Sequence, residues 1–276
     1  MSSRFRRALA LFALVIATAA PVCAQEPPRT LRVCADPNNL PFSNAREEGF
    51  ENRIVRLIAA ELGADVEYTW WAQRRGFIRN TLNAGVCDLV AGVPADYELT
   101  LTTRPYYRSS YVVVSRQAQG GQITDLDDPA LRSLRIGVQM IGDDFANTPP
   151  VHALSQRGIV DNVRGFLVYG NYAEASPAAE IVSAVASGEI DLALVWGPLA
   201  GYFAARQQPP LAVTPLTAHA PDLPFEFDIA IGVRRQDRAR RDLLDQVLEC
   251  RKRDIDRILA EYHVPRVDRA PAGAVR

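Results

Sequence analysis

Lysine, histidine and cysteine are scarce in this chain of 276 residues. Lys252 is the only lysine, so a Schiff-base or phosphate-loop lysine has one available position, and both chemistries are disfavoured. The histidines His152, His219 and His263 stand far apart, which argues against a histidine metal site. The formal net charge is −1, with no clustered excess of base, so we expect no nucleic acid as a partner.

Recognisable catalytic motifs are also missing. The chain has no Gly-X-Ser-X-Gly segment, no Cys/His pair and no phosphate loop, so we expect a protein that is not an enzyme and carries no cofactor. What is present is ordinary globular composition, with 48% hydrophobic residues. This composition excludes disordered, collagen-like and disulfide-scaffold proteins, and the length suits one large domain or two of average size.

The first 24 residues have the pattern of a secretory signal peptide. Arg4, Arg6 and Arg7 precede an apolar run at 8–20, and small residues lead to a cleavage site after Ala24. The run is shorter than the roughly 20 residues that cross a bilayer, so we expect no membrane span in the mature chain. Without residues 1–24, which hold three arginines and no acid, 252 residues with a net charge of −4 remain. We therefore expect a mildly acidic periplasmic protein.

Three cysteines remain in the mature chain, Cys34, Cys87 and Cys250. In an oxidising compartment an odd number allows one disulfide with one free thiol, or three buried thiols. The sequence leaves both alternatives open.

The order of apolar runs and turn residues predicts two similar α/β lobes, each a mostly parallel sheet flanked by helices. In the first lobe we expect strands at 31–35, 66–71 and 88–93 and helices at 50–62 and 76–83. A further strand is expected at 111–114, before a polar linker at 117–122, and in the second lobe we expect strands at 134–138, 166–169 and 191–196 and helices at 152–157 and 178–186. The order helix, Gly85, Asp88, strand recurs as helix, Gly188, Asp191, strand.

A last strand at 227–233 and a helical region at 243–262 lie outside the second repeat. We infer that the chain returns there to the first lobe. The expected division is a signal peptide at 1–24, lobe 1 at 25–115, lobe 2 at 116–225, and a return crossing with C-terminal helices on lobe 1 at 226–276.

Two lobes joined by a return crossing resemble the type II periplasmic solute-binding proteins, which deliver small solutes to ABC transporters. Five segments are similar to one subgroup of that family, at 36–44, 49–52, 68–77, 104–111 and 137–150. The subgroup is the MoxJ/XoxJ group of proteins associated with PQQ-dependent methanol or alcohol dehydrogenases. The resemblance implies the type II fold and an accessory role in maturation or activation of such a dehydrogenase, with its c-type cytochrome as a further partner.

One departure from the transport members concerns the ligand. Amino-acid-binding relatives place an arginine just after the third strand, whereas the stretch 92–99 contains none. A bidentate clamp for a carboxylate is therefore missing at that position. The alternative function is a transport receptor that closes on a small organic solute, and the missing arginine disfavours amino acids as its ligands. Because periplasmic dehydratases share the fold, a lyase is a further alternative.

Candidate site residues come from the segments that follow the strands, because the carboxyl ends of strands face the crevice in open α/β sheets. They are Asp36, Asn38, Asn39, Phe42, Trp70, Trp71, Arg74, Arg75, Tyr107, Arg108, Ser109, Gln139, Asp143, Asp144 and Trp196.

Each group of candidates also has a purely structural interpretation. Trp70, Trp71 and the pair Arg74 and Arg75 suit a partner interface or a planar ligand, since Trp and Arg dominate interface hot spots. Alternatively, one tryptophan packs in the core and the arginines pair with surface acids. In the second lobe, the acids at 143–144 suit a cation site or a helix cap, and the tryptophan at 196 suits cleft closure or ordinary packing.

Overall fold

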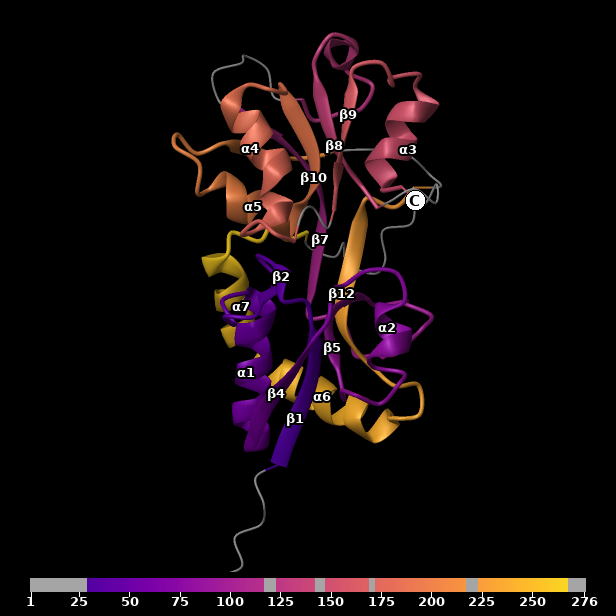
Figure 1. Ribbon diagram of the computed structural model, residues 1–276, viewed down its shortest axis with the longest axis vertical. Coiled ribbons are helices and arrows are strands. Elements are labelled where there is room, and N and C mark those ends of the chain that lie inside the picture. Colours follow the sequence, from indigo (N-terminus) through magenta and orange to yellow (C-terminus); the bar gives the residue numbers. More distant parts are fainter. Residues whose placement is uncertain (1–28, 117–122, 142–146, 169–171, 217–222, 268–276) are drawn as a thin grey trace, which may run out of the picture.

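The computed structural model describes residues 29–116, 123–141, 147–168, 172–216 and 223–267. Figure 1 shows two lobes stacked along the longest axis of the molecule, joined by two long strands. These strands are β7 (Tyr107–Ser115) and β12 (Glu226–Val233), which pair antiparallel with each other. No helix of the described residues is long and apolar enough to cross a membrane.

Lobe 1, the lower lobe in Figure 1, is built on strands β1 (Arg29–Ala35), β4 (Ala64–Trp70) and β5 (Val90–Pro94). β1 pairs parallel with β4, and a bridge from Val33 to Leu89 links β1 to the stretch before β5. Helix α1 (Phe50–Leu62) has the bounds that the sequence predicts, and Gly63 ends it in the left-handed conformation, with φ 59°. Glycine adopts that conformation without the steric cost of a Cβ.

Two C-terminal helices complete lobe 1. Helices α6 (Arg238–Cys250) and α7 (Lys252–Glu261) pack on α1, and their apolar faces share one core with it. The smaller elements of the lobe are the hairpin of β2 (Asn38–Asn39) and β3 (Ser43–Asn44), helix α2 (Phe77–Asn80), and β6 (Leu101–Thr102).

Lobe 2 contains the parallel strands β8 (Ile136–Met140), β9 (Val163–Leu167) and β10 (Leu192–Trp196). The connected sheet has the strand order β5-β12-β7-β10-β8-β9, and β11 (Ala212–Pro215) pairs with β7. Helices α3 (Pro149–Gln156), α4 (Glu180–Ser187) and α5 (Gly197–Ala204) and two short 3-10 helices, Pro129–Arg132 and Pro177–Ala179, flank it. Strands β7 and β12 run through both lobes and belong to one connected sheet. The division of the chain between residues 115 and 116 and between residues 225 and 226 therefore stays a proposal.

The helices differ from the sequence predictions in three places. The helix expected at 76–83 is the single turn α2, because Thr81 ends it by donating its hydroxyl to the Phe77 carbonyl at 2.6 Å. Helix α5, which begins directly after Trp196 with a proline in its first turn, was missed. The helical region at 243–262 starts earlier and is two helices that meet at Arg251.

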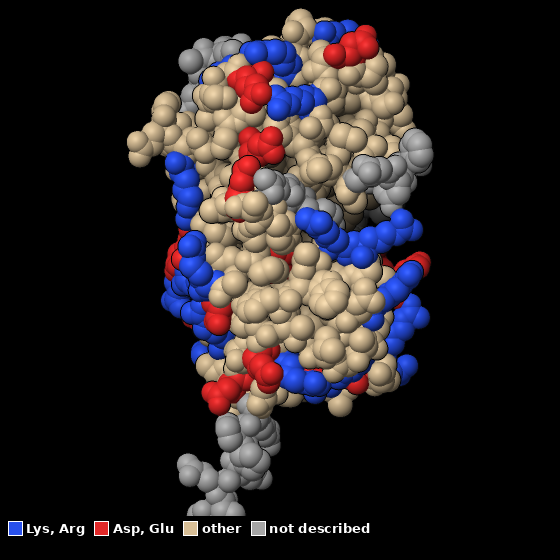
Figure 2. Space-filling model, viewed as in Figure 1, with Lys and Arg blue, Asp and Glu red and all other residues tan. Residues whose placement is uncertain are grey.

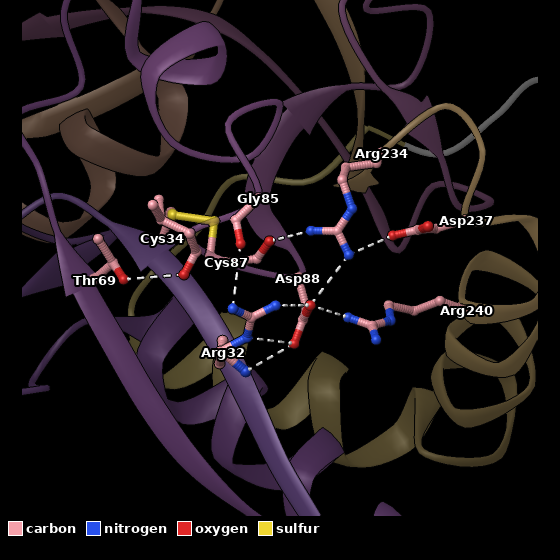
Figure 3. Close-up of polar contacts among 10 residues, drawn as sticks. Arg32, Cys34, Thr69, Gly85, Cys87, Asp88, Arg234, Asp237 and Arg240 are labelled. Carbon is pink, nitrogen blue, oxygen red and sulfur yellow. Dashed lines mark hydrogen bonds and ion pairs between the residues drawn. A yellow bond between two sulfur atoms is a disulfide. The ribbon is translucent and has the colours of Figure 1, made fainter.

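The repeat of Gly and Asp in the two lobes corresponds to a repeated arginine–aspartate ion pair, Arg32 with Asp88 and Arg135 with Asp191, which we call the clamp of each lobe. Arg32 on β1 donates from Nη2 to Asp88 Oδ1 at 2.8 Å, and Arg135 before β8 donates in the same way to Asp191 at 2.7 Å. A second arginine, from the end of a crossing strand, contacts the loop of each clamp: Arg234 binds the Cys87 carbonyl, and Arg116 binds the Ile190 carbonyl at 2.9 Å. In lobe 1 a further arginine, Arg240, lies 2.6 Å from Asp88 (Figure 3).

The cysteines are arranged as one disulfide and one free thiol. Cys34 and Cys87 are bonded, with their Cα atoms 5.6 Å apart, and Cys250 is free and exposed. The bond ties the end of β1 to the loop before β5, beside the Asp88 clamp (Figure 3). This outcome selects the first of the two alternatives that the sequence left open.

Candidate binding cleft between the lobes

A cleft of about 330 Å³ lies between the two lobes. Its walls come from loops of both lobes and from the crossing strands, and its lining residues are Asn39, Phe42, Glu51, Gln73, Gly92, Pro94, Tyr111, Gln139, Ile141, Thr148, Val168, Trp196, Leu199, Phe227 and Ile229. None of them is a lysine or an arginine. The lining described by the structure therefore has no group that could pair with a ligand carboxylate.

One wall of the cleft is aromatic. The rings of Tyr111 and Trp196 have centroids 5.4 Å apart, and Phe227 stands edge-on to Trp196 at 5.8 Å. β7, β10 and β12 each supply one of these rings, so the wall forms where the crossing strands meet lobe 2. Such a wall suits a flat apolar group, with aromatic contacts worth about 0.5–1.5 kcal/mol each beyond burial.

Glu51 carries the one carboxyl group among the described residues that line the cleft. It lies in the first turn of α1 beside Gly92 on β5, where a Cβ would come within 2.0 Å of its Oε1 atom. Burial raises the pKa of the Glu51 carboxyl to about 8, and the negative charge of Asp36 adds to the rise. At neutral pH the carboxyl is therefore mostly protonated and the cleft carries little charge.

We expect Glu51→Gln to make the protein more stable than the wild type above pH 8 and nearly equal to it at pH 5. The native pKa lies above the unfolded value, so the wild type loses stability as pH rises from about 4.5 to 8, while the neutral amide does not titrate. The difference should be roughly 2 kcal/mol, because the side chain keeps some contact with solvent. Urea unfolding at several pH values measures it, and curves that stay parallel over this range would refute the assignment.

Three of the sequence-predicted residues connect the lobes instead of lining the cleft. Asp36 is buried and accepts hydrogen bonds from the Tyr172 hydroxyl and from the Gln73 backbone N–H at 2.7 Å. Asn38 donates to the Glu174 carbonyl at 2.8 Å. Arg74 stacks its guanidinium 4.8 Å above the ring of Tyr172. We call these contacts between residues 36–38 or 74 and the segment 172–174 the lobe bridge.

Four other predicted residues do line the cleft, namely Asn39, Phe42, Gln139 and Trp196. Gln139 is buried and accepts the Trp196 backbone N–H at 2.8 Å, so the glutamine holds the start of α5 against the sheet. Asn39 donates to Gln73 at 3.2 Å and positions another lining residue.

The prediction was wrong for the segment after Pro105. Tyr107 is buried in the lobe 1 core, edge-on to Phe50 at 6.0 Å, because strand alternation turns it inward. Arg108 is neutralised by Glu226 and Asp228 on β12, at 3.0 and 3.1 Å. Ser109 is buried and donates to the Pro265 carbonyl at 2.6 Å, so it fastens the C-terminal segment.

Trp70, the last residue of β4, and Trp71, which follows it, also stand outside the cleft lining. Trp70 stacks on Tyr68 with centroids 4.4 Å apart, whereas Trp71 is 48% exposed. Asp143 and Asp144 lie outside the described residues. Within the described chain no group of three or more His, Cys, Asp or Glu side chains could hold a metal ion.

A second, larger hollow opens from the cleft on the side of α2. Its volume is about 1,050 Å³, and it shares Gln73, Gly92, Pro94 and Ile141 with the cleft. We call it the side groove. Arg74 and Arg75, which the sequence indicated, line it together with Arg79.

Sequence reasoning missed Glu51, Tyr111 and Phe227. Glu51 follows the first buried residue of α1, and its only signal was its place in a segment shared with the resembling subgroup. The two aromatic residues were read as ordinary strand positions. Their role depends on β7 and β12 crossing at the cleft, which a single strand pattern does not reveal.

Comparison with known proteins identifies the family of this chain. The family model of bacterial extracellular solute-binding proteins, family 3, matches residues 31–265. The chain belongs to this family. The α/β, two-lobed type II fold is thereby confirmed.

Individual relatives in this family point to the MoxJ/XoxJ group. Protein MoxJ of Methylorubrum extorquens AM1 is 32% identical over 86% of this chain and 81% of its own length. Protein MoxJ of Paracoccus denitrificans is 28% identical over 95% of this chain and 97% of its own length. The crystal structure of the periplasmic binding protein XoxJ from Methylobacterium extorquens AM1 is 37% identical, with a TM-score of 0.72, covering 87% of this chain and all of that one. This family 3 protein is thus MoxJ/XoxJ-like.

Proposed function

We propose that this family 3 protein is a periplasmic accessory protein that binds a PQQ-dependent methanol or alcohol dehydrogenase and assists its maturation or activation. The similarity to MoxJ and XoxJ over nearly the whole mature chain carries the proposal. The cleft supports it, since its described lining lacks the cation that a receptor for amino acids or organic acids needs.

Partner binding is proposed for the rim of the cleft, where exposed Trp71 and the arginines Arg74 and Arg75 stand on one strand-to-helix turn. Trp and Arg side chains are enriched among residues that dominate binding energy. The c-type cytochrome that accepts electrons from the dehydrogenase is a further partner on this hypothesis.

The test is association with the dehydrogenase encoded by the same organism. We expect the purified proteins to bind in calorimetry, and the accessory protein to raise PQQ loading or activity of the dehydrogenase. Arg74→Ala with Arg75→Ala should weaken binding by roughly tenfold or more, since two interface arginines are lost. Arg253→Ala, at an exposed position of α7, is the matched control and should bind normally.

Failure to bind and failure to change loading or activity would together overturn the proposal. Normal binding by the double variant would remove these arginines from the interface while leaving the accessory role intact.

The volume of the cleft favours one second candidate, a transport receptor for a small solute. About 330 Å³ with an aromatic wall and one mostly protonated carboxyl suits a neutral or cationic planar molecule. A receptor must show a saturable rise in melting temperature with its ligand. Thermal-shift screening with alcohols, amines, organic acids and PQQ separates the two functions.

A further inference from the structure

The side groove differs in charge from the rest of the molecule. Among the described residues, Arg74, Arg75 and Arg79 line it, and no aspartate or glutamate does. Asp96 and Glu98 lie on the facing loop, but they are exposed and outside the lining, which takes only Tyr97 and Leu99 from that loop. Figure 2 shows a group of Lys and Arg side chains at the junction of the lobes on the side of α2.

Arg74 and Arg79 differ from most other arginines of the described structure, which pair with acids. Arg32, Arg135 and Arg157 each pair with an aspartate within 3 Å. Arg79, by contrast, is exposed on α2 and has no ion pair or hydrogen bond among the described residues. The Arg74 guanidinium lies above the Tyr172 ring and pairs with no carboxylate among the described residues. The groove therefore presents positive charge that a partner can neutralise.

The floor of the side groove is apolar. Phe77, Ile78 and Val93 are buried beneath it, and Ile141 on its edge is 42% exposed. Tyr97 and Leu99 add two further partly buried side chains. Guanidinium groups around an apolar floor match a chain that carries acids and apolar side chains together.

The size of the groove favours an occupant larger than a small anion. Its volume of about 1,050 Å³ is open to the cleft, which adds about 330 Å³. Small-molecule sites usually measure about 300–1,000 Å³ and enclose their ligand. An extended peptide reaches along such a groove and into the cleft, where the aromatic wall offers a place for one apolar side chain.

We propose that the side groove binds an acidic, apolar peptide segment of the partner protein. Carboxylates of the segment pair with Arg74 and Arg79, its apolar side chains pack on Tyr97, Leu99 and Ile141, and one end enters the cleft. The inference rests on the proposed function only in taking that partner to be the dehydrogenase or its cytochrome.

A peptide probe tests the groove directly. A fluorescein-labelled octapeptide that alternates aspartate with leucine or phenylalanine should bind in fluorescence anisotropy. Arg79→Gln should weaken this binding by roughly three- to tenfold, as expected for the loss of one charge-assisted contact at a partly exposed site. Raising the ionic strength from about 0.05 M to about 0.3 M should also weaken it, because surface charges are screened.

Matched controls separate charge, apolar contact and fold. Arg253→Gln should bind the peptide normally, since that arginine lies on α7, away from the groove. A peptide with lysine for aspartate, and one with serine for each apolar residue, should bind weakly or not at all. Arg79→Gln changes an exposed side chain and should melt at the wild-type temperature.

Equal affinity of Arg79→Gln and wild type for the acidic peptide, or equal affinity for the lysine peptide, would overturn the inference. If citrate or inorganic phosphate at similar concentration competes as well as the peptide does, the groove is a small-anion site and the peptide proposal is wrong. If the dehydrogenase binds but is indifferent to Arg79→Gln, the groove inference fails and the accessory role stands. If the peptide binds and the dehydrogenase does not, the groove inference stands and the accessory role fails.

Discussion

Asp88→Asn should lower the free energy of unfolding by about 3 kcal/mol at neutral pH. Asp88 is 5% exposed and faces Arg32, Arg234 and Arg240 at 2.8, 3.2 and 2.6 Å. Burial by itself raises the pKa of its carboxyl, but the hydrogen bonds from these arginines outweigh burial and hold the pKa well below the ordinary value. The amide cannot balance three guanidinium groups, and their partial exposure limits the loss.

The pH dependence gives the sign of this effect. Because the native pKa of Asp88 is depressed, its contribution to stability is present above the unfolded value of about 3.9 and is lost as pH falls below it. The difference between wild type and Asp88→Asn in chemical denaturation should therefore shrink below pH 4. Asp242→Asn, at a 60% exposed side chain on α6, serves as control and should change stability little.

The corresponding clamp of lobe 2 gives an internal comparison. Two arginines hold the pKa of the Asp191 carboxyl at about 2, with the Arg135 hydrogen bond as the main cause. One of them, Arg135, is 55% exposed and can rehydrate. Asp191→Asn should therefore lower the free energy of unfolding by less than Asp88→Asn does. A larger loss would contradict the importance given to Arg240, the third arginine at Asp88.

Removing the Cys34–Cys87 disulfide is the second change with a large expected effect. The bond closes a loop with a sequence separation of 53 residues. In the chain-entropy description, releasing such a loop costs about 4 kcal/mol of stability, because the unfolded chain gains freedom. We expect Cys34→Ala with Cys87→Ala to melt well below wild type and to be insensitive to reducing agent.

Cys250→Ala is the matched control for the disulfide. That thiol is free and exposed, so its removal should leave the melting temperature and its sensitivity to reducing agent unchanged. Peptide mapping under non-reducing conditions gives an independent readout. A wild-type protein whose melting temperature is unaffected by reduction would show that the bond adds nothing to stability.

Some of the residues that line the cleft could be predicted from the sequence, because their position depends on where single strands end. Residues at or just beyond the carboxyl ends of strands reach the crevice because parallel strands end at one edge, which is why Asn39, Gln139 and Trp196 line the cleft. Tyr107 and Ser109 belong to a strand that runs through both lobes, so the same rule does not apply to them. Their inward orientation comes from alternation on β7, and the two predictions failed there.

The contacts of Asp36, Asn38 and Arg74 with the other lobe could not be predicted from the sequence. The sequence predicts that each faces the crevice, and in the structure each contacts the segment 172–174 of lobe 2. The partners are 134 or more residues away in the Asn38 and Asp36 contacts. Only the relative position of two lobes brings such groups together, so no local pattern predicts the lobe bridge.

The sequence by itself determined the α/β class, the helix α1 with its Gly63 end, and the repeated Gly and Asp positions of the two lobes, because periodicity and turn residues act over short distances. The single lysine also means that nearly all positive side-chain charge of this chain comes from arginine. Tertiary structure alone decided which cysteines pair, which arginines are neutralised and which remain in the side groove, and that Glu51 lies enclosed beside Gly92. These properties depend on burial and on contacts between distant segments, and both arise only when the crossing strands join the lobes.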